Sequence, residues 1–188
     1  MAIRILFSFL IACSAFGAEV AGVKLPDEDQ KLLLNGAGLR KRAFFQVYVI
    51  GLYLPERKTA AADAIGAAGP KRVLIEMLRD VDADQFSDAL TDGMKDNVAE
   101  AEMKALQPRI KQLTDIIASM KEAKKGMRIA LDWVPAAGTL VTVAGKAAGA
   151  PIPGEDFFRA LLKIWLGEHP VQDDVKRALL GGTRGEKP

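Results

Sequence analysis

The most strand-like part of the sequence is a run of aromatic and β-branched residues at positions 39–54. Gly36 and Gly38 precede this run and Pro55 follows it, which is typical of the limits of a β-strand. The run is long for one strand, and its second half is apolar at both odd and even positions. We therefore expect the second half to be a central strand that is covered on both faces of a sheet.

Further extended segments are predicted on either side of a helical middle region. A second strand is expected at residues 72–78, after an Ala- and Gly-rich connection at 59–70 that has room for about one helical turn. A hairpin is expected at 127–143, with its turn at 135–138.

From residue 84 the apolar positions recur every three to four residues, which predicts helices. Phe86, Leu90 and Met94 form one apolar stripe of a helix that runs to about residue 97. Asp82 or Asp84 can cap the start of this helix.

Three more helices follow the same rule. The longest is predicted at residues 103–120, where Pro108 should either bend the helix or mark its first turn. Two others are expected at 156–166 and 173–180. Strands and helices in this order predict a single α+β domain at residues 18–188.

The first residues form no part of this predicted domain. Residues 1–17 contain Arg4, an apolar run at 5–12 and then small residues, as in an export signal peptide. The run is shorter than the roughly 20 apolar residues that cross a bilayer, and no later stretch reaches that length without a charge. We therefore expect an exported protein without a transmembrane segment.

The position of signal cleavage decides the fate of Cys13. Small residues at 15 and 17 suit ordinary signal peptidase, which would remove Cys13 with the peptide. Residues 10–13, LIAC, alternatively resemble a lipoprotein signature, in which Cys13 would carry a lipid tether. Both interpretations leave Cys13 without a catalytic role.

Composition excludes several classes of function. Lys and Arg number 26 against 24 Asp and Glu, and a net charge of +2 argues against a nucleic-acid-binding surface. The sequence contains one Cys and one His, which cannot make a zinc site or a disulfide framework. Neither a phosphate-binding loop nor a G-x-S-x-G motif is present, and we expect no metal and no cofactor.

Two separated motifs give the sequence a family resemblance. Residues 34–40 and 45–54 read LNGAGLR and FQVYVIGLYL, and residues 164–171 read IWLGEHPV. In this order and spacing they resemble the chalcone isomerase family, and in particular its secreted bacterial chalcone isomerase-like group. The resemblance implies an open-faced β-sandwich, with a large antiparallel sheet, helices packed on one face and a ligand cleft between them. For a secreted bacterial protein we expect a periplasmic location.

The resemblance also shows where this chain departs from the catalytic pattern. In the plant isomerases an Arg in the GAG motif, a Thr on the following strand, a Tyr and an Asn on the first helix and a Thr on the penultimate helix line the cleft. Here the Arg is kept as Arg40. The other four positions correspond to Tyr48, Phe86, Gly93 and Ile164. Because a missing oxyanion donor typically costs about 10²- to 10³-fold in rate, catalysis of the plant kind is not expected.

An Arg followed by a Tyr resembles instead the non-catalytic fatty-acid-binding members of the superfamily. The implied function is binding of a fatty acid or similar amphipathic carboxylate by Arg40 and Tyr48, beside an apolar cleft that includes Phe86 and Ile164. A guanidinium can grip a carboxylate through two charge-assisted bonds. A straight strand from Arg40 to Tyr48 would cover about 26 Å, so both can share one ligand only if the chain bends between them.

Other interpretations remain open at this stage. An isomerase or lyase with an altered donor set could act on a chalcone-like enone, and a partner-binding module could use the basic residues at 121–125. Arg40 also lies in a basic run at 40–42 that is typical of a solvated strand edge. Phe44 and Phe45 cannot both point inward, so one is expected to line a cleft.

Two single residues receive structural interpretations. Trp165 is expected to be a buried anchor. His169 precedes a proline and has no candidate partners nearby in the sequence, so we expect a surface or cap residue.

Overall fold

The structure is a computed structural model that describes residues 17–182. The predicted signal peptide up to residue 16, with Cys13 and both cleavage hypotheses, lies outside the described residues. The same holds for residues 183–188 at the other end of the chain.

Residues 17–182 form strands and helices that follow one another along the chain. The strands are β1 (Ala18–Val20), β2 (Val23–Leu25), β3 (Glu28–Asp29), β4 (Leu32–Arg42), β5 (Phe45–Leu54), β6 (Lys71–Met77), β7 (Val81–Asp82), β8 (Glu122–Ala123), β9 (Arg128–Val134), β10 (Gly138–Val143) and β11 (Lys146–Ala147). The helices are α1 (Ala61–Gly66), α2 (Ala83–Lys95), α3 (Glu100–Ala118), α4 (Glu155–Leu166) and α5 (Asp173–Leu179).

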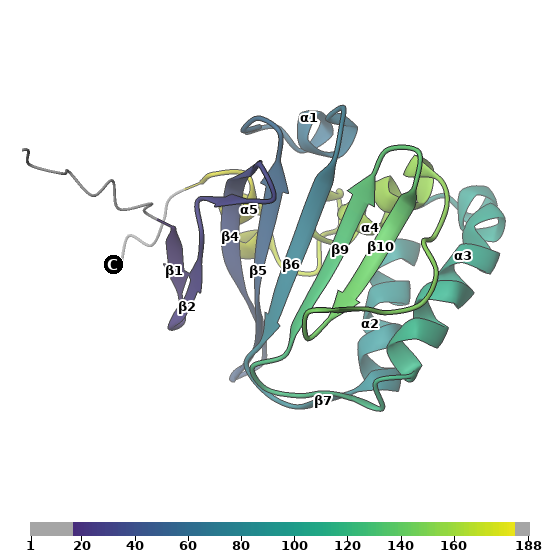
Figure 1. Ribbon diagram of the computed structural model, residues 1–188, viewed down its shortest axis with the longest axis horizontal. Helices are drawn as coiled ribbons and strands as arrows, with labels where there is room; N and C mark the ends of the chain where they lie inside the picture. Colours follow the sequence, from purple (N-terminus) through teal and green to yellow (C-terminus); the bar gives the residue numbers. More distant parts are fainter. Residues whose placement is uncertain (1–16, 183–188) are drawn as a thin grey trace, which may run out of the picture.

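A large antiparallel sheet forms the centre of the molecule (Figure 1). Its strand order is β11-β10-β9-β6-β5-β4-β3, and every neighbouring pair is antiparallel. β1 and β2 form a separate hairpin, and β7 pairs with β8. Apart from the crossover that carries α2 and α3 between β6 and β9, each strand of the large sheet pairs with its neighbour in sequence.

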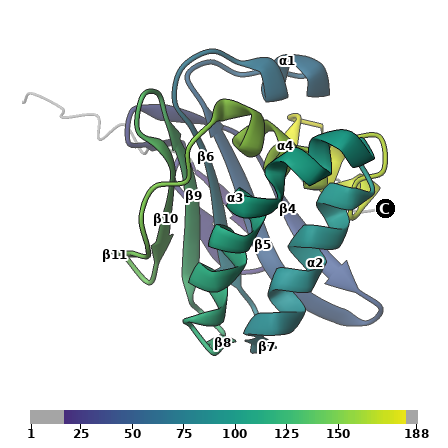
Figure 2. The same ribbon diagram turned by 90° about the vertical axis from the view of Figure 1, so that its right-hand side faces the viewer.

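The two faces of the sheet are covered by different layers. In β5, Tyr48, Ile50 and Leu52 point into the core that the helices complete, whereas Val49 and Tyr53 pack toward the β1–β2 hairpin. Figure 2 shows α2, α3 and α4 in front of the sheet. The prediction of a strand covered on both faces is therefore confirmed, as is the α+β fold with an antiparallel sheet and helices on one face.

The run at residues 39–54, which is long for one strand, belongs to two strands. β4 ends at Arg42 and β5 begins at Phe45, and the two strands pair as an antiparallel hairpin. Ala43 takes a positive φ of 53° in the turn between them. A turn of Ala43 and Phe44 contains no Gly, Asn or Pro, so the usual turn signal is missing from the sequence.

The helices agree more closely with the periodicity. Asp82 caps α2 as predicted, because its carboxylate accepts hydrogen bonds from the backbone N–H groups of Asp84 and Gln85. α3 begins at Glu100, so Pro108 lies within the helix and not in its first turn. Pro108 is exposed, and the backbone carbonyl that it leaves unbonded can face water.

The glycines of the GAG motif let α5 approach β4. A Cβ atom at Gly36 would lie 2.0 Å from the backbone oxygen of Ala178, and one at Gly38 would lie 3.3 Å from the Cβ of that residue. Only a residue without a side chain fits at position 36. This motif therefore fixes the position of the last helix beside the strand that carries Arg40.

Candidate functional site

The β4–β5 hairpin places Arg40 and Tyr48 side by side, although a straight strand would separate them. Arg40 is the direct cross-strand partner of Tyr48 in the register of the hairpin. The bend that the ligand hypothesis requires is thus supplied by the turn at Ala43 and Phe44. The two side chains lie at the end of the sheet near this turn.

Tyr48 is buried beneath α4. Its hydroxyl oxygen accepts a hydrogen bond of 2.9 Å from Nε1 of Trp165. Burial raises the pKa of Tyr48, and the Trp165 hydrogen bond and the charge of Arg40 offset only part of this rise. The phenol therefore stays protonated at neutral pH, and its own O–H remains a donor.

Arg40 is a half-buried cation held by neutral groups. One of its terminal N–H groups donates to the carbonyl of Lys41 at 2.5 Å and to Oε1 of Gln172 at 3.3 Å. Within residues 17–182 it forms no ion pair with a carboxylate. A guanidinium has five N–H donors, so the charge and several donors of Arg40 are free to bind an anion.

Gln172 positions this arginine and was not identified from the sequence. It precedes α5 and, besides meeting Arg40, accepts the backbone N–H of Lys41 at 2.9 Å and donates to the carbonyl of Leu39 at 3.3 Å. This glutamine thus joins the last helix to β4. Nothing in its local sequence signals the contact, because more than 130 residues separate the partners.

The remaining candidate residues make the site apolar. Phe86 and Ile164 are buried in the same core cluster as Tyr48. Gly93 lies against Ile164, since a Cβ atom at this position would be 2.8 Å from Cγ2 of Ile164. An Asn at position 93 would collide with that side chain. Phe86, Gly93 and Ile164 carry no side-chain donor that could polarise a carbonyl group.

Two pockets lie elsewhere on the molecule. One of about 620 Å³ is bordered by α1 and by the ends of α2 and α4, and includes Asn97 and His169 in its lining. The other, of about 870 Å³, lies between β1, β4 and the end of α5. Neither of these two is lined by Arg40 or Tyr48. Tyr48 is buried against α4, where Trp165 contacts its hydroxyl.

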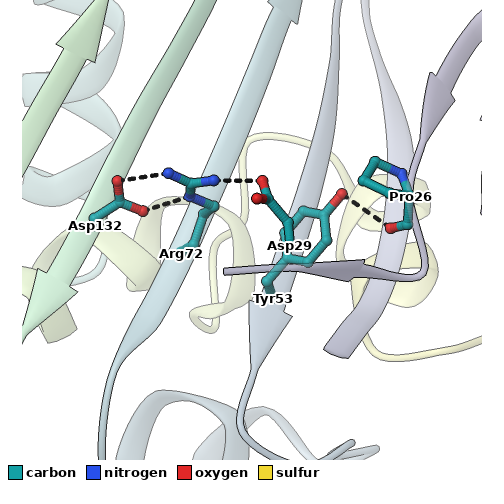
Figure 3. Close-up of polar contacts among 5 residues, drawn as sticks. All are labelled: Pro26, Asp29, Tyr53, Arg72 and Asp132. Atoms are coloured by element: carbon teal, nitrogen blue, oxygen red, sulfur yellow. Dashed lines mark hydrogen bonds and ion pairs between the residues drawn. The ribbon is translucent and has the colours of Figure 1, made fainter. Parts of the chain in front are cut away.

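A second polar cluster lies on the opposite face of the sheet (Figure 3). Arg72 donates to both carboxylate oxygens of Asp132, at 2.6 and 2.9 Å, and also pairs with Asp29. Tyr53, the cross-strand neighbour of Arg72, donates to the carbonyl of Pro26. No local sequence pattern predicts this cluster, because its members come from four separate segments.

The electrostatics of this cluster indicate a structural role. Hydrogen bonds from Arg72 to Asp132 raise the pKa of Arg72, and burial raises the pKa of Tyr53. Each of the three guanidinium nitrogens already donates to a carboxylate. Unlike Arg40, Arg72 therefore has its charge fully neutralised by the protein.

The structure decides the interpretation of four other residues. Trp165 is a buried anchor as predicted, and His169 is exposed, with its backbone N–H bound by Oδ1 of Asn97 at 2.8 Å. The expectation that Phe44 or Phe45 lines a cleft is wrong, since both are exposed at the tip of the hairpin.

No helix in residues 17–182 is long and apolar enough to cross a membrane. No group of three or more potential metal ligands occurs in the same part of the chain.

Comparisons with known proteins point to one family and one fold. The sequence model of the family described as chalcone isomerase-like matches residues 17–181. Among solved structures, a fatty-acid-binding protein of Arabidopsis thaliana is similar with a TM-score of 0.64 and 16% identity. The match covers 85% of this chain and 92% of the plant protein. A search of curated protein sequences found no match.

Proposed function

We propose that this chain, which belongs to the chalcone isomerase-like family, binds a fatty acid or similar amphipathic carboxylate. In this proposal it does not catalyse a reaction. The observation that carries the proposal is the pairing of Arg40 with Tyr48. A half-buried cation with no carboxylate partner in residues 17–182 lies beside a buried phenol that can donate. Such a pair suits a carboxylate head group, which accepts charge-assisted hydrogen bonds from both.

The apolar part of the ligand would enter between β5 and α4. Phe86 and Ile164 border this region, and Met77 and Met94 belong to the same core. Methionine side chains change conformation at low cost, so they can make room for an acyl chain that the packed core does not yet hold. The similarity to a plant fatty-acid-binding protein supports this assignment at the level of the fold.

The donor pattern argues against turnover. Three of the positions that supply donors in the plant isomerases hold Phe86, Gly93 and Ile164, and a collision with Ile164 excludes a larger residue at Gly93. The loss of even one oxyanion donor typically lowers the rate by about 10²- to 10³-fold.

A binding titration of the purified chain with a long-chain fatty acid tests the proposal. Arg40→Ala should weaken binding by about 10- to 100-fold, because it removes a charged hydrogen-bond donor. Arg42→Ala is the matched control, since Arg42 is an exposed arginine two residues along the same strand and should leave the affinity unchanged. Equal affinity of Arg40→Ala and wild type would contradict the proposal.

The same protein can be tested for the alternative activity. Tyr48 keeps a neutral O–H donor, which is the one feature here that would suit an intramolecular lyase acting on a chalcone-like enone. That alternative requires turnover above the spontaneous rate, and its loss in Tyr48→Phe. Absence of turnover in wild type supports pure binding.

We also propose export to the periplasm, on the basis of the signal-like residues 1–17. Cell fractionation should recover the protein from the periplasmic fraction. Cys13→Ser separates the two cleavage hypotheses, because it abolishes processing of a lipoprotein and leaves ordinary signal cleavage intact.

A further inference from the structure

The tip of the β4–β5 hairpin exposes two aromatic side chains to solvent. Phe44 is fully exposed and Phe45 is 58% exposed, and both lie beyond the end of the core. With Leu33, which is 36% exposed, they are the large hydrophobic residues most exposed in residues 17–182. We call residues 41–46 the finger.

The finger is surrounded by cations that the protein leaves unpaired. Lys41 and Arg42 are exposed, and the guanidinium of Arg79 lies 4.4 Å from the centre of the Phe45 ring. Within residues 17–182 none of these three cations forms an ion pair. Their charge is therefore available to a partner.

A neighbouring loop extends this basic end of the sheet. Backbone hydrogen bonds join Leu78 to Val47 and Gly126 to Met77, so the 121–127 loop lies at the same end as the finger. Lys121, Lys124 and Lys125 are exposed on this loop.

Some acidic groups also occur at this end of the sheet. Asp80 accepts the backbone N–H of Lys125, and Glu76 is paired with Arg128. Asp82 caps α2 and Glu122 is its cross-strand partner. Within residues 17–182 none of these carboxylates is paired with a cation of the finger or with Arg79.

We propose that the finger docks on the anionic surface of a lipid bilayer. Aromatic rings next to lysines and arginines are the combination that inserts shallowly among lipid head groups, with the rings at the acyl boundary and the cations on the phosphates. Each lysine or arginine near an anionic bilayer adds roughly a fivefold gain in binding. The finger carries both the aromatic rings and the cations on one short turn.

The docking surface adjoins the candidate ligand site. Arg40 immediately precedes the finger in β4, and Tyr48 follows it in β5. A docked finger would hold the carboxylate site at the level of the lipid head groups, from which a free fatty acid could be taken up. The docking itself stands on the finger alone and does not depend on the proposed function.

Flotation with vesicles tests the docking. Wild-type protein should bind vesicles made of equal parts phosphatidylcholine and phosphatidylglycerol and bind pure phosphatidylcholine far more weakly. Lys41→Gln with Arg42→Gln should lower binding by about 30-fold, and added salt should lower wild-type binding. Phe44→Ser with Phe45→Ser should abolish stable binding.

Matched controls separate the finger from general effects of charge and apolar surface. Leu33→Ser removes an exposed apolar residue from the opposite end of β4, and Lys24→Gln with Lys104→Gln removes two exposed cations elsewhere. Leu33→Ser should bind the mixed vesicles like wild type. The variant with Lys24→Gln and Lys104→Gln should lose far less than 30-fold of the vesicle binding. Phe44→Trp should show a blue-shifted emission on adding the mixed vesicles.

Three results would overturn the proposal. They are failure of wild type to bind the mixed vesicles, unchanged binding in both finger variants, and self-association without lipid that Phe44→Ser removes. The last would identify the finger as a contact between copies of this chain. The finger variants should keep fatty-acid affinity in solution, so a failure of docking is distinguishable from a failure of the ligand site.

Discussion

Single residues show why two arginines on one sheet have different roles. Arg72 neutralises its charge against Asp132 and Asp29, whereas Arg40 meets only the neutral groups of Lys41, Gln172 and Tyr48. Both are partly or fully buried, so exposure does not distinguish them. The distinction depends on their partners, and it favours Arg40 as the residue that binds an external anion.

The hydrogen bond between Trp165 and Tyr48 can be measured as a coupling. Trp165→Phe and Tyr48→Phe should each remove about 0.5–1.5 kcal/mol through the lost hydrogen bond, and Trp165→Phe more because it also leaves space in the core. Both single variants lose the same hydrogen bond, and the double variant loses it only once. The stability loss of the double variant should therefore be smaller than the sum of the two single losses. Urea unfolding of the four proteins checks this, and strict additivity would contradict it.

The ion pair between Lys71 and Glu155 predicts a loss of stability in acid. Lys71 is fully buried, its Nζ lies 2.8 Å from Oε1 of Glu155, and this hydrogen bond lowers the pKa of Glu155. A carboxylate with a lowered folded-state pKa stabilises the protein above its unfolded pKa of about 4.3. That stability should disappear as the pH falls through the folded-state pKa.

Unfolding free energies measured from neutral pH down to about pH 3 test this pair. Glu155→Gln should flatten the acid slope and cost about 1–3 kcal/mol at neutral pH, because it leaves the buried Lys71 charge without a counter-charge. Lys71→Met should cost less, since it removes that charge. The slope that remains in Glu155→Gln should include Asp156, whose pKa is lowered by Arg109. An unchanged slope in Glu155→Gln would contradict the assignment.

At the scale of elements, the contact of α5 with β4 depends on the missing side chain at Gly36. Gly36→Ala should destabilise the protein by about 1–3 kcal/mol or more, since the new Cβ would meet the backbone of Ala178 and not a flexible side chain. Gly66→Ala, where nothing lies within 4 Å, should be neutral or slightly stabilising. Thermal unfolding compares the two, and an equal effect would show that close approach does not matter.

The elements also show what the sequence could predict. The helices were predicted closely because Phe86, Leu90 and Met94 repeat with a helical period that packing against a sheet preserves. The position of the turn was not predicted, because Ala43 and Phe44 are not the Gly, Asn or Pro residues that usually mark a turn. Sequence alone therefore showed that the chain must bend between Arg40 and Tyr48 if they share one ligand, but not where it turns.

Only the part of the candidate site that lies in a local sequence motif could be predicted. The family resemblance pointed to Arg40 and Tyr48, but the contacts made by Trp165 and Gln172 come from segments more than 100 residues away. Such partners depend on how the helices dock. No local pattern of the sequence carries that information.

At the scale of the whole molecule, side chains from strands that are not neighbours in the large sheet meet on one of its faces. β3 and β6 are separated by two strands in the sheet order, yet Asp29 of β3 pairs with Arg72 of β6. In Figure 3 the segment that carries Asp29 runs across the face of the sheet to reach this arginine. The Arg72 cluster therefore joins the segment with Asp29 to the face of the sheet that the helices do not cover.

Removal of the Arg72 side chain from this cluster should destabilise the whole domain. Arg72→Ala should cost about 3–5 kcal/mol, because it leaves the buried carboxylate of Asp132 without a counter-charge. Arg72→Met combined with Asp132→Leu should recover most of that loss. Urea unfolding measures both variants, and a double variant as unstable as Arg72→Ala would show that the charges themselves are required.

The short turn of the β4–β5 hairpin also has a consequence for the order of folding. Arg40 and Tyr48 pair within a local hairpin, a structure that forms in about 1–10 μs, whereas Trp165 is 117 residues distant from Tyr48. Trp165 can dock on Tyr48 only when long-range contacts form, and these form more slowly. The charged half of the site can thus form early, while its apolar cover arrives with α4.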